Sequence, residues 1–255
     1  MTKTTLITGA TAGIGEATAR LLAKNGYNLI VTGRRKARLD NLKKDLEKNT
    51  TAKVYTLNFD IRHRDKVEQA LDSLPDEWKD IEVLINNAGL AAGLGPLHEG
   101  DLDDWEQMID TNVKGLLYIS RKILPGMVER RKGHVINISS TAGKEVYMNG
   151  NVYCATKFAV DALNKAMRLE LVDHGVKVTS VNPGFTETEF SLVRFKGDRE
   201  KAKMPYAGME PLRAEDIAEV ILFVLSRPDH VNINEIIVTP KAQANAFYIH
   251  RERER

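Results

Sequence analysis

The chain has 255 residues, of which 42% are hydrophobic, enough to bury the core of one large α/β domain or two small ones. No linker rich in Pro, Gly or Ser divides it, so we expect a single domain over residues 1–255. The 37 basic and 35 acidic side chains give a formal charge of +2, too balanced to favour a nucleic acid partner. A single cysteine excludes an intramolecular disulfide, and no apolar run approaches the roughly 20 residues of a membrane span. These features together predict a cytoplasmic protein without membrane partners.

Short apolar runs alternate with longer amphipathic segments along the whole chain. Several of these runs are apolar on both faces, as in parallel strands that helices cover from both sides. The repeated β-α order predicts an α/β protein with a doubly wound, seven-stranded parallel sheet and helices on both faces. The predicted strands are Thr4–Thr8, Asn28–Thr32, Lys53–Asn58, Val83–Asn86, His134–Ile138, Lys177–Asn182 and Glu235–Val238. Helix starts are expected near Asp103–Asp104 and Pro211, and helix ends near Gly26 and Gly175.

Two segments depart from this alternation. Residues 186–209 mix aromatic and basic side chains without a clean period, so we interpret them as a substrate lid over the strand ends. The alternative is an ordinary surface excursion. Residues 250–255 alternate in charge and are expected to form a frayed, solvated tail, with specific docking as the alternative.

A glycine-containing turn follows the first predicted strand and leads directly into a helix. It reads Gly9-Ala10-Thr11-Ala12-Gly13-Ile14-Gly15. Glycines permit a close approach of the backbone, and free N–H groups at a helix N-terminus bind pyrophosphate. The spacing G-x-x-x-G-x-G differs from the general G-x-G-x-x-G fingerprint, but its position predicts nucleotide binding through Gly9, Thr11, Gly13, Ile14 and Gly15.

The end of the second predicted strand indicates which dinucleotide binds. A site that prefers NAD places an acidic residue there, whereas this chain has Gly33 followed by Arg34 and Arg35. Guanidinium groups bind the 2′-phosphate of NADP through paired hydrogen bonds, so NADP(H) is favoured over NAD(H). The alternative is that these arginines only begin a solvated basic helix with Lys36 and Arg38.

Further polar and small residues follow the third and fourth predicted strands. Asp60 is expected to orient the adenine, and the run Asn87-Ala88-Gly89 is expected to lie against the cofactor. Ligands bind at the carboxyl ends of strands in this architecture. Ordinary turn chemistry is the alternative for both.

Tyr153 and Lys157 stand four residues apart at the start of a long helical pattern, so one helix face carries both. A nearby ammonium and an oxidised nicotinamide would stabilise the phenolate, which lets the tyrosine exchange a proton with a substrate oxygen. Ser140, chosen over Ser139, follows a strand and is expected to hold the same oxygen. Asn112 is expected to hold a water that links Lys157 to solvent, with a structural polar residue as the alternative.

In their order and spacing, these motifs resemble the short-chain dehydrogenase/reductase family over nearly the full chain. The resemblance implies a Rossmann-type sheet and a catalytic tetrad of Asn112, Ser140, Tyr153 and Lys157, with Lys157 also binding the nicotinamide ribose. It further implies coenzyme contacts from Pro183, Gly184, Thr186 and Thr188. By analogy, it implies a homo-oligomer, with a tetramer favoured.

A closer similarity is to the NADP-dependent 3-hydroxy acid dehydrogenases of this family. It rests on segments that include Thr32–Arg35, Asp104–Asn112, Gly150–Tyr153, Thr188–Asp198 and His230–Asn234. It implies hydride transfer between nicotinamide and serine, allo-threonine or a 3-hydroxypropionate/malonic semialdehyde pair. The alternatives are a carbonyl reductase of other ketones, sugars or steroids, and a non-catalytic NADP-binding regulator.

A carboxylate-bearing substrate needs a cation near the reacting centre. Arg194 is favoured for this role, with Lys196 and Lys144 as alternatives. Cys154 borders Tyr153 but is interpreted as a small helix residue rather than a nucleophile. The six histidines show no metal-ligand spacing, so no metal is expected.

Overall fold

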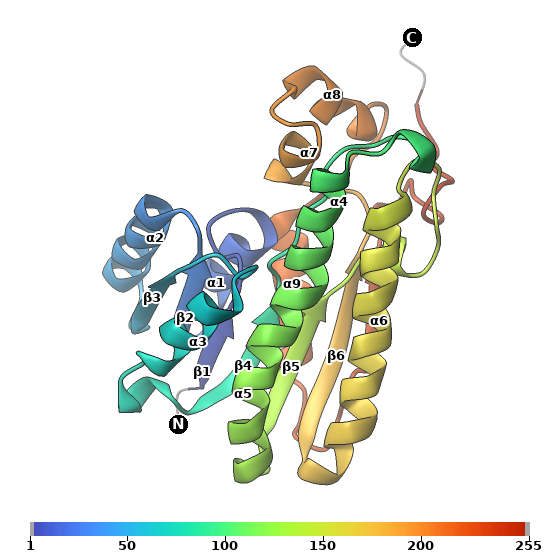
Figure 1. The fold of residues 1–255 in the computed structure, drawn as a ribbon. Coiled ribbons are helices and arrows are strands. Elements are labelled where there is room, and N and C mark those ends of the chain that lie inside the picture. Colours follow the sequence, from blue (N-terminus) through green and yellow to red (C-terminus); the bar gives the residue numbers. More distant parts are fainter. Residues whose placement is uncertain (1–2, 253–255) are drawn as a thin grey trace.

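The protein is described by a computed structural model over residues 3–252. A seven-stranded sheet in the order β3-β2-β1-β4-β5-β6-β9 forms its centre, and every neighbouring pair is parallel (Figure 1). The predicted fold class is confirmed, with strand ends displaced by at most two residues. The strands are β1 (Thr4–Ile7), β2 (Asn28–Gly33), β3 (Val54–Asn58), β4 (Ile81–Asn86), β5 (Gly133–Ile138), β6 (Val176–Pro183) and β9 (Glu235–Val238).

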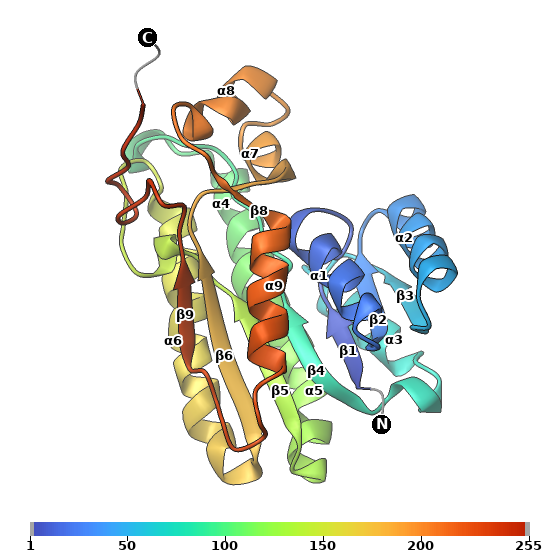
Figure 2. The ribbon, with the colours of Figure 1, turned by 180° about the vertical axis from the view of Figure 1, so that it is seen from behind.

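Helices cover both faces of the sheet. Figure 2 shows α1 (Gly13–Lys24) and α9 (Ala214–Leu225) side by side on one face, with α2 (Lys36–Asn49) beside them. The opposite face, seen in Figure 1, carries the other long helices. These are α3 (Arg64–Asp72), α4 (Leu102–Ile109), α5 (Leu116–Arg130) and α6 (Asn151–Leu171). The chain therefore has the three-layer α/β/α arrangement that parallel strands require.

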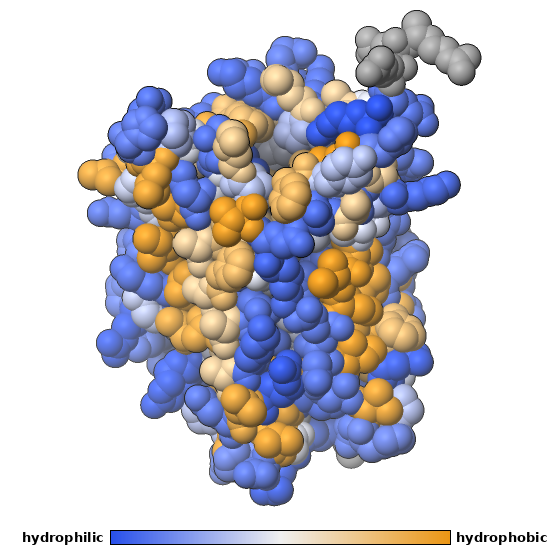
Figure 3. Space-filling model, turned by 90° about the vertical axis from the view of Figure 1, so that its right-hand side faces the viewer, coloured by the Kyte–Doolittle hydropathy of each residue, from blue (hydrophilic) through white to orange (hydrophobic). Residues whose placement is uncertain are grey.

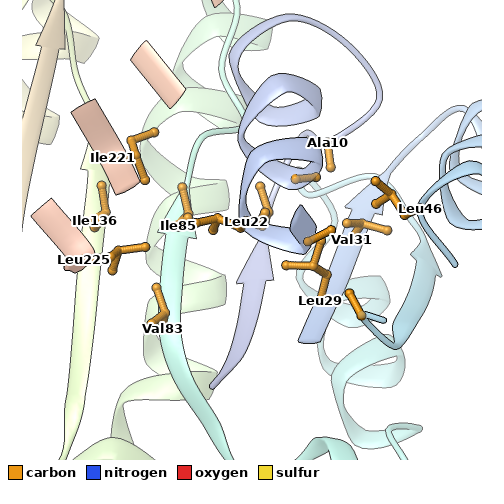
Figure 4. Close-up of a cluster of buried hydrophobic side chains, with 14 of the residues drawn as sticks. Ala10, Leu22, Leu29, Val31, Leu46, Val83, Ile85, Ile136, Ile221 and Leu225 are labelled. Atoms are coloured by element: carbon orange, nitrogen blue, oxygen red, sulfur yellow. The ribbon is translucent and has the colours of Figure 1, made fainter. Parts of the chain in front are cut away.

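Apolar side chains on each face of the sheet pack against the covering helices. Figure 4 shows one of these clusters, in which Leu22 of α1 and Ile221 of α9 lie over Ile85 of β4. All three side chains are fully buried. Burying a side chain of this size contributes roughly 1.5–3 kcal/mol, so both helices are held firmly on the strands that lead into the loops above.

The predicted helix limits are close to those observed. Helix α4 begins at Leu102 because Asp101 accepts hydrogen bonds from the backbone N–H groups of Asp103 and Asp104 at 3.0 and 3.3 Å. The acidic pair expected at its start therefore lies in its first turn. Gly26 and Gly175, at φ +80° and +67°, follow the preceding helical segments as expected.

The predicted lid segment contains its own regular structure. Its first residues form β7 (Thr186–Glu187), which pairs in parallel with β8 (Leu212–Arg213) just beyond the predicted segment, and the sequence did not indicate this small sheet. Between them lie α7 (Glu189–Arg194) and α8 (Arg199–Lys203), above the carboxyl ends of the strands (Figure 1). The segment has the position expected of a lid, and its movement stays a prediction.

Two residues of the predicted tail contact the lid segment. The Arg251 guanidinium donates hydrogen bonds to the carbonyl oxygens of Pro205 and Ala207, and the Glu252 amide donates to the Gly208 carbonyl at 2.8 Å. Arg251 and Glu252 therefore contact the lid segment, because backbone carbonyls of that segment accept their donors, while both residues remain exposed. The rest of the predicted tail, residues 253–255, lies outside the described residues.

Within residues 3–252, no helix has the length and apolar character needed to cross a membrane.

Candidate active site

A cavity of about 830 Å³ lies at the carboxyl ends of the strands, between the glycine turn, the ends of β4 and β5, and the lid. Nearly all of the predicted site residues line it, from Gly9 at the glycine turn to Arg194 in the lid. Gly15 and Asn112 are the predicted residues that stand behind its wall. The parallel register explains this gathering, because each strand delivers its following loop to the same edge of the sheet.

The glycine turn is held against the end of β4 by side-chain hydrogen bonds. Asn87 Nδ2 donates to the carbonyl oxygens of Thr8 and Gly9 at 2.9 and 3.2 Å, and the Ala88 amide donates to Thr8 Oγ1 at 3.0 Å. A Cβ atom at Gly15 would lie 2.4 Å from Asn87 Nδ2. Gly15 therefore permits close packing of the turn, while Asn87 fixes the position of the turn beneath the cavity.

Glycines, which have no side chain, leave room for a dinucleotide along this wall. Gly13 has φ +55°, and a Cβ atom there would meet Thr188 Cβ at 3.2 Å. At the other end, a Cβ atom on Gly89 would lie 3.3 Å from Asn112 Oδ1 and 3.5 Å from Lys157 Nζ. A backbone free of side chains beside a helix N-terminus suits a pyrophosphate, so the residues present fit a nicotinamide dinucleotide.

Three positively charged side chains mark the outer end of the cavity. Arg35 donates from Nε and Nη2 to Thr11 Oγ1 at 3.1 and 2.8 Å, so it is fixed to the glycine turn. Arg38, one turn further along α2, contacts the Thr11 carbonyl at 3.3 Å. Arg34 lies 3.8 Å from Asp60, whose carboxylate is bound mainly by Arg62 at 2.7 Å. Arg34, Arg35 and Asp60 all line the cavity, and their contacts with a coenzyme stay predictions.

Tyr153 and Ser140 meet at the inner end of the cavity. The Tyr153 side chain is buried, and burial raises the pKa of its phenol well above the ordinary value, while Arg194 and a hydrogen bond with Ser140 act in the opposite direction. Ser140 Oγ accepts from the Ala142 amide at 3.1 Å and donates to the Pro183 carbonyl at 3.4 Å. The protein's own groups therefore keep the phenol protonated at neutral pH, where it can donate a proton.

Lys157 lies behind Tyr153 on the next turn of α6. Its Nζ atom donates to the Ile138 carbonyl at 2.9 Å and stands 6.0 Å from the centroid of the Tyr153 ring. Burial lowers the pKa of this ammonium to about 8. The ammonium therefore lies close to the Tyr153 ring. The two side chains share one face of α6, as predicted.

Asn112 occupies a π-helical turn (Asp110–Gly115) between α4 and α5. Its Oδ1 accepts from the Leu90 amide at 2.9 Å, and its Nδ2 donates to the Leu90 carbonyl at 2.8 Å and to Thr156 Oγ1 at 3.0 Å. The amide thus ties the loop after β4 to helix α6. Such π turns are common at functional sites, and the expected water-holding role stays a prediction.

Arg194 extends from the lid over Tyr153. Its guanidinium carbon lies 4.8 Å from the centroid of the Tyr153 ring, and its Nη2 donates to Tyr147 Oη at 2.6 Å. Lys144 is bound to Asp161 and Glu235, and Lys196 is bound to Asp101 and Asp104, both away from the cavity lining. Of the three cations named for a substrate carboxylate, Arg194 is the one beside Tyr153.

Among the residues in and around the site, the sequence did not single out Arg38, Glu189 or Tyr147. Glu189 binds Arg35 and Arg38 from the lid, although it is about 150 residues away in the chain. Arg38 could have been found from its spacing of three residues after Arg35 on a helix. No signal in the sequence indicated that Tyr147 would hold Arg194, because the loop between β5 and α6 has no regular period.

Cys154 and the histidines have no visible role in the site. The Cys154 side chain is buried, and burial raises the pKa of its thiol, which agrees with its interpretation as a packing residue. Across residues 3–252, no three His, Cys, Asp or Glu side chains gather as metal ligands. The absence of a metal stays a prediction.

Comparison with known proteins defines the class of this protein. The family model described as short chain dehydrogenase matches residues 3–198. The chain belongs to the short-chain dehydrogenase family. It is 50% identical over 248 residues to the NADP-dependent 3-hydroxy acid dehydrogenase YdfG of Salmonella typhi, covering 96% of this chain and 98% of that protein.

Two other similar proteins are named serine dehydrogenases. Serine 3-dehydrogenase of Agrobacterium fabrum is 44% identical over 253 residues, covering 99% of this chain and 100% of that protein. The closed form of serine dehydrogenase complexed with NADP+ superposes with a TM-score of 0.92 at 47% identity, covering 98% of this chain and 100% of that one. The predicted family, fold class and enzyme class are confirmed, and the predicted coenzyme and substrate class agree with these names.

Proposed function

We propose that this chain is an NADP(H)-dependent oxidoreductase that transfers a hydride between nicotinamide and a small 3-hydroxy acid of the serine, allo-threonine or 3-hydroxypropionate type. One observation carries the proposal: the Arg194 guanidinium lies 4.8 Å from the ring of Tyr153, the proton-transfer residue. A cation at this place would hold a substrate carboxylate while the carbon two bonds away reacts beside the phenol. The glycine turn, Arg34 and Arg35 support the coenzyme assignment, as do the names of the relatives.

The coenzyme would lie along the wall formed by Gly9 and residues 11–14, by residues 87–89, and by residues 183–186 together with Thr188, with the nicotinamide near Tyr153. When bound, NADP(H) supplies or accepts the hydride at C4 of its nicotinamide ring, and its oxidised ring is cationic. Tyr153 donates its phenolic proton to the carbonyl oxygen during reduction and takes a proton from the hydroxyl during oxidation. The hydroxyl of Ser140, which donates to the Pro183 carbonyl at 3.4 Å, would turn its one hydrogen toward the same oxygen and hold it in place.

Lys157 supports this proton transfer from behind. Its Nζ already donates one hydrogen bond to the Ile138 carbonyl, which leaves its other two N–H groups for the ribose of the coenzyme. Since its pKa is about 8, the ammonium is charged at neutral pH and favours the phenolate form of Tyr153 during alcohol oxidation.

Arg194 is prepared for an anionic partner. Tyr147 and Phe190 flank its guanidinium at 5.8 and 5.2 Å from their ring centroids, which fixes the plane of the group. Its Nε atom is buried and has no hydrogen-bond partner among the described residues. A buried donor without an acceptor costs free energy, and a carboxylate would satisfy it through a two-point contact.

The test is a substrate panel with purified protein, followed by NADPH absorbance. We expect turnover of L-serine, allo-threonine and 3-hydroxypropionate with NADP+, and lower kcat/KM for neutral alcohols of similar size. Preference for neutral ketones would contradict the substrate class and favour a general carbonyl reductase. Tight NADPH binding without turnover of any compound would contradict enzymatic function altogether.

We also propose that the protein works in the cytoplasm as a homo-oligomer, with a homotetramer favoured. Large hydrophobic side chains are exposed on α4, α5 and α6, among them Leu102, Leu117, Phe158 and Leu169. Figure 3 shows hydrophobic patches on the side of the molecule where α6 runs. Exposed apolar patches mark protein interfaces, and light scattering after gel filtration tests the number of copies. A monomer at micromolar concentration would contradict the proposal.

A further inference from the structure

An acidic residue of the lid binds Arg35, which we assign to the coenzyme, and its neighbour Arg38. Glu189, the first residue of α7, accepts a hydrogen bond from Arg35 Nη1 at 2.7 Å. Its carboxylate also accepts from Arg38 Nη1 at 2.8 and 2.9 Å. The carboxylate therefore lies between two guanidinium groups, at the point where the lid meets the start of α2.

This ion cluster stands at the position that a 2′-phosphate would take. Gly33 ends β2 where an acidic residue would bind the ribose hydroxyls of NAD, and a Cβ atom there would lie 2.6 Å from Thr11 Cγ2. Arg35 connects Glu189 to the glycine turn, because it also donates two hydrogen bonds to Thr11 Oγ1. Arg35, Thr11, Gly33 and Glu189 all line the same cavity.

A carboxylate and a phosphate make the same kind of contact with a guanidinium group. Both are anions that accept paired N–H groups, so the Nη1 atoms of Arg35 and Arg38 cannot give the same hydrogen atoms to both. The arginines hold the pKa of Glu189 below its ordinary value, so the side chain is charged at neutral pH. A second anion close to this carboxylate would also be repelled by it.

The cluster can be displaced at modest cost. The side chains of Arg35, Arg38 and Glu189 are 44%, 47% and 41% exposed, so solvent screens their attraction. A phosphate dianion carries more charge than the carboxylate and can take its place. The ribose hydroxyl of NAD has no charge and would leave the cluster intact.

Building on the proposed use of NADP(H), we propose that Glu189 competes with the 2′-phosphate of the coenzyme for Arg35 and Arg38. Glu189 is then a specificity-determining residue that weakens the preference for NADP(H) over NAD(H). The preference is set jointly by the arginines at the start of α2 and by a carboxylate of the lid that lies above them.

The experiment measures binding of the phosphate without hydride transfer. Calorimetric titrations at fixed ionic strength compare adenosine 2′,5′-bisphosphate with 5′-AMP for the wild-type protein and for Glu189→Gln. We expect Glu189→Gln to bind the bisphosphate about five- to tenfold more tightly, with the affinity for 5′-AMP within about twofold of wild type. Unchanged binding of 5′-AMP also shows that the variant is folded.

Glu187→Gln is the matched control. Glu187 lies two residues away, is exposed, and forms no ion pair within residues 3–252, so its removal changes the net charge equally without freeing the arginines. Equal tightening in both variants would overturn the proposal, because a general charge effect would then suffice. Equal or weaker bisphosphate binding in Glu189→Gln would also overturn it.

The same titrations separate this proposal from the proposed coenzyme. If wild-type protein bound 5′-AMP as tightly as the bisphosphate, the NADP(H) assignment itself would fail. If wild type preferred the bisphosphate and Glu189→Gln did not increase that preference, the coenzyme assignment would stand and competition by Glu189 would be wrong.

Discussion

The two ends of the cavity use charge in opposite ways. At the inner end, Tyr153 and Lys157 are buried, with 8% and 6% of their surface exposed. At the outer end, Arg35, Arg38 and Glu189 are nearly half exposed and bind one another. Burial moves the pKa of Tyr153 upward and that of Lys157 down to about 8, whereas in the outer cluster hydrogen bonds from Arg35 lower the pKa of Glu189.

This difference corresponds to different tasks. Proton transfer needs a group whose protonation changes during the reaction, and burial creates such a group by penalising its charged form. Binding a phosphate needs charges that remain fixed and can exchange partners, which exposed arginines provide. Removing groups from the two ends should therefore separate catalysis from coenzyme selection.

The largest effect is expected at the inner end. Tyr153→Phe removes the proton donor while keeping the ring that packs against Phe190 at 5.5 Å between centroids. We expect kcat to fall by about 10²- to 10⁴-fold while the Kd for NADPH stays within about twofold. Steady-state kinetics and fluorescence titration measure the two quantities. Tyr118→Phe on α5 is the control, and near-normal turnover in Tyr153→Phe would refute the proposed mechanism.

A buried group outside the site isolates the effect of burial on stability. His134 of β5 is 5% exposed, its Nε2 lies 2.8 Å from Thr179 Oγ1, and burial lowers its pKa to about 3. Between pH 6.5 and 3 the unfolded chain binds a proton that the folded protein does not. Stability is therefore fully present above pH 6.5 and is lost as the pH falls, by about 1.4 kcal/mol per pH unit from this group.

Urea denaturation at several pH values measures that slope. His134→Gln should show a flatter loss of unfolding free energy between pH 6 and pH 4 than wild type. His98→Gln is the control, because His98 is exposed and its loss should leave the slope unchanged. Identical slopes in wild type and His134→Gln would show that burial of this imidazole does not contribute to acid sensitivity.

The residues at the inner end of the cavity were easier to predict from the sequence than those at the outer end. Apolar runs revealed the seven strands, and a parallel sheet brings the strand ends together, so the joint position of Ser140, Tyr153 and Lys157 followed from local spacing. Each of these residues lies at the end of a strand or the start of a helix. Their environment depends on the sheet, which the pattern of hydrophobic residues determines.

The outer cluster depends on the position of the lid, and the lid sequence has no regular hydrophobic period. Glu189 meets Arg35 because β7 pairs with β8 and thereby places α7 above the glycine turn. These strands have two residues each, too short to be recognised from alternation. The contacts of Arg251 and Glu252 with the lid were also missed, because their acceptors are backbone carbonyls, which carry no sequence signature.

An intermediate effect is expected where the lid reaches the inner end. Arg194→Ala should lower the ratio of kcat/KM for a 3-hydroxy acid to that for a neutral alcohol by about 10- to 100-fold, since a charged hydrogen-bond pair is lost. Using the ratio cancels any change in the pKa of Tyr153, to which Arg194 contributes. Lys196→Ala removes a nearby cation that binds Asp101 and Asp104 instead. An unchanged ratio in Arg194→Ala would remove this residue from substrate recognition.

The smallest effect is expected for a single arginine at the outer end, because its neighbours partly replace it. Arg35→Ala should raise the Kd for NADPH by about three- to tenfold and leave the Kd for NADH unchanged, with a smaller difference at high salt. Arg34→Ala should raise the Kd for NADPH less, because the Arg34 guanidinium lies 3.8 Å from the Asp60 carboxylate, whereas Arg35 binds Thr11 in the glycine turn. Equal losses for NADPH and NADH in Arg35→Ala would mean that Arg35 supports the turn through Thr11 and does not recognise the phosphate.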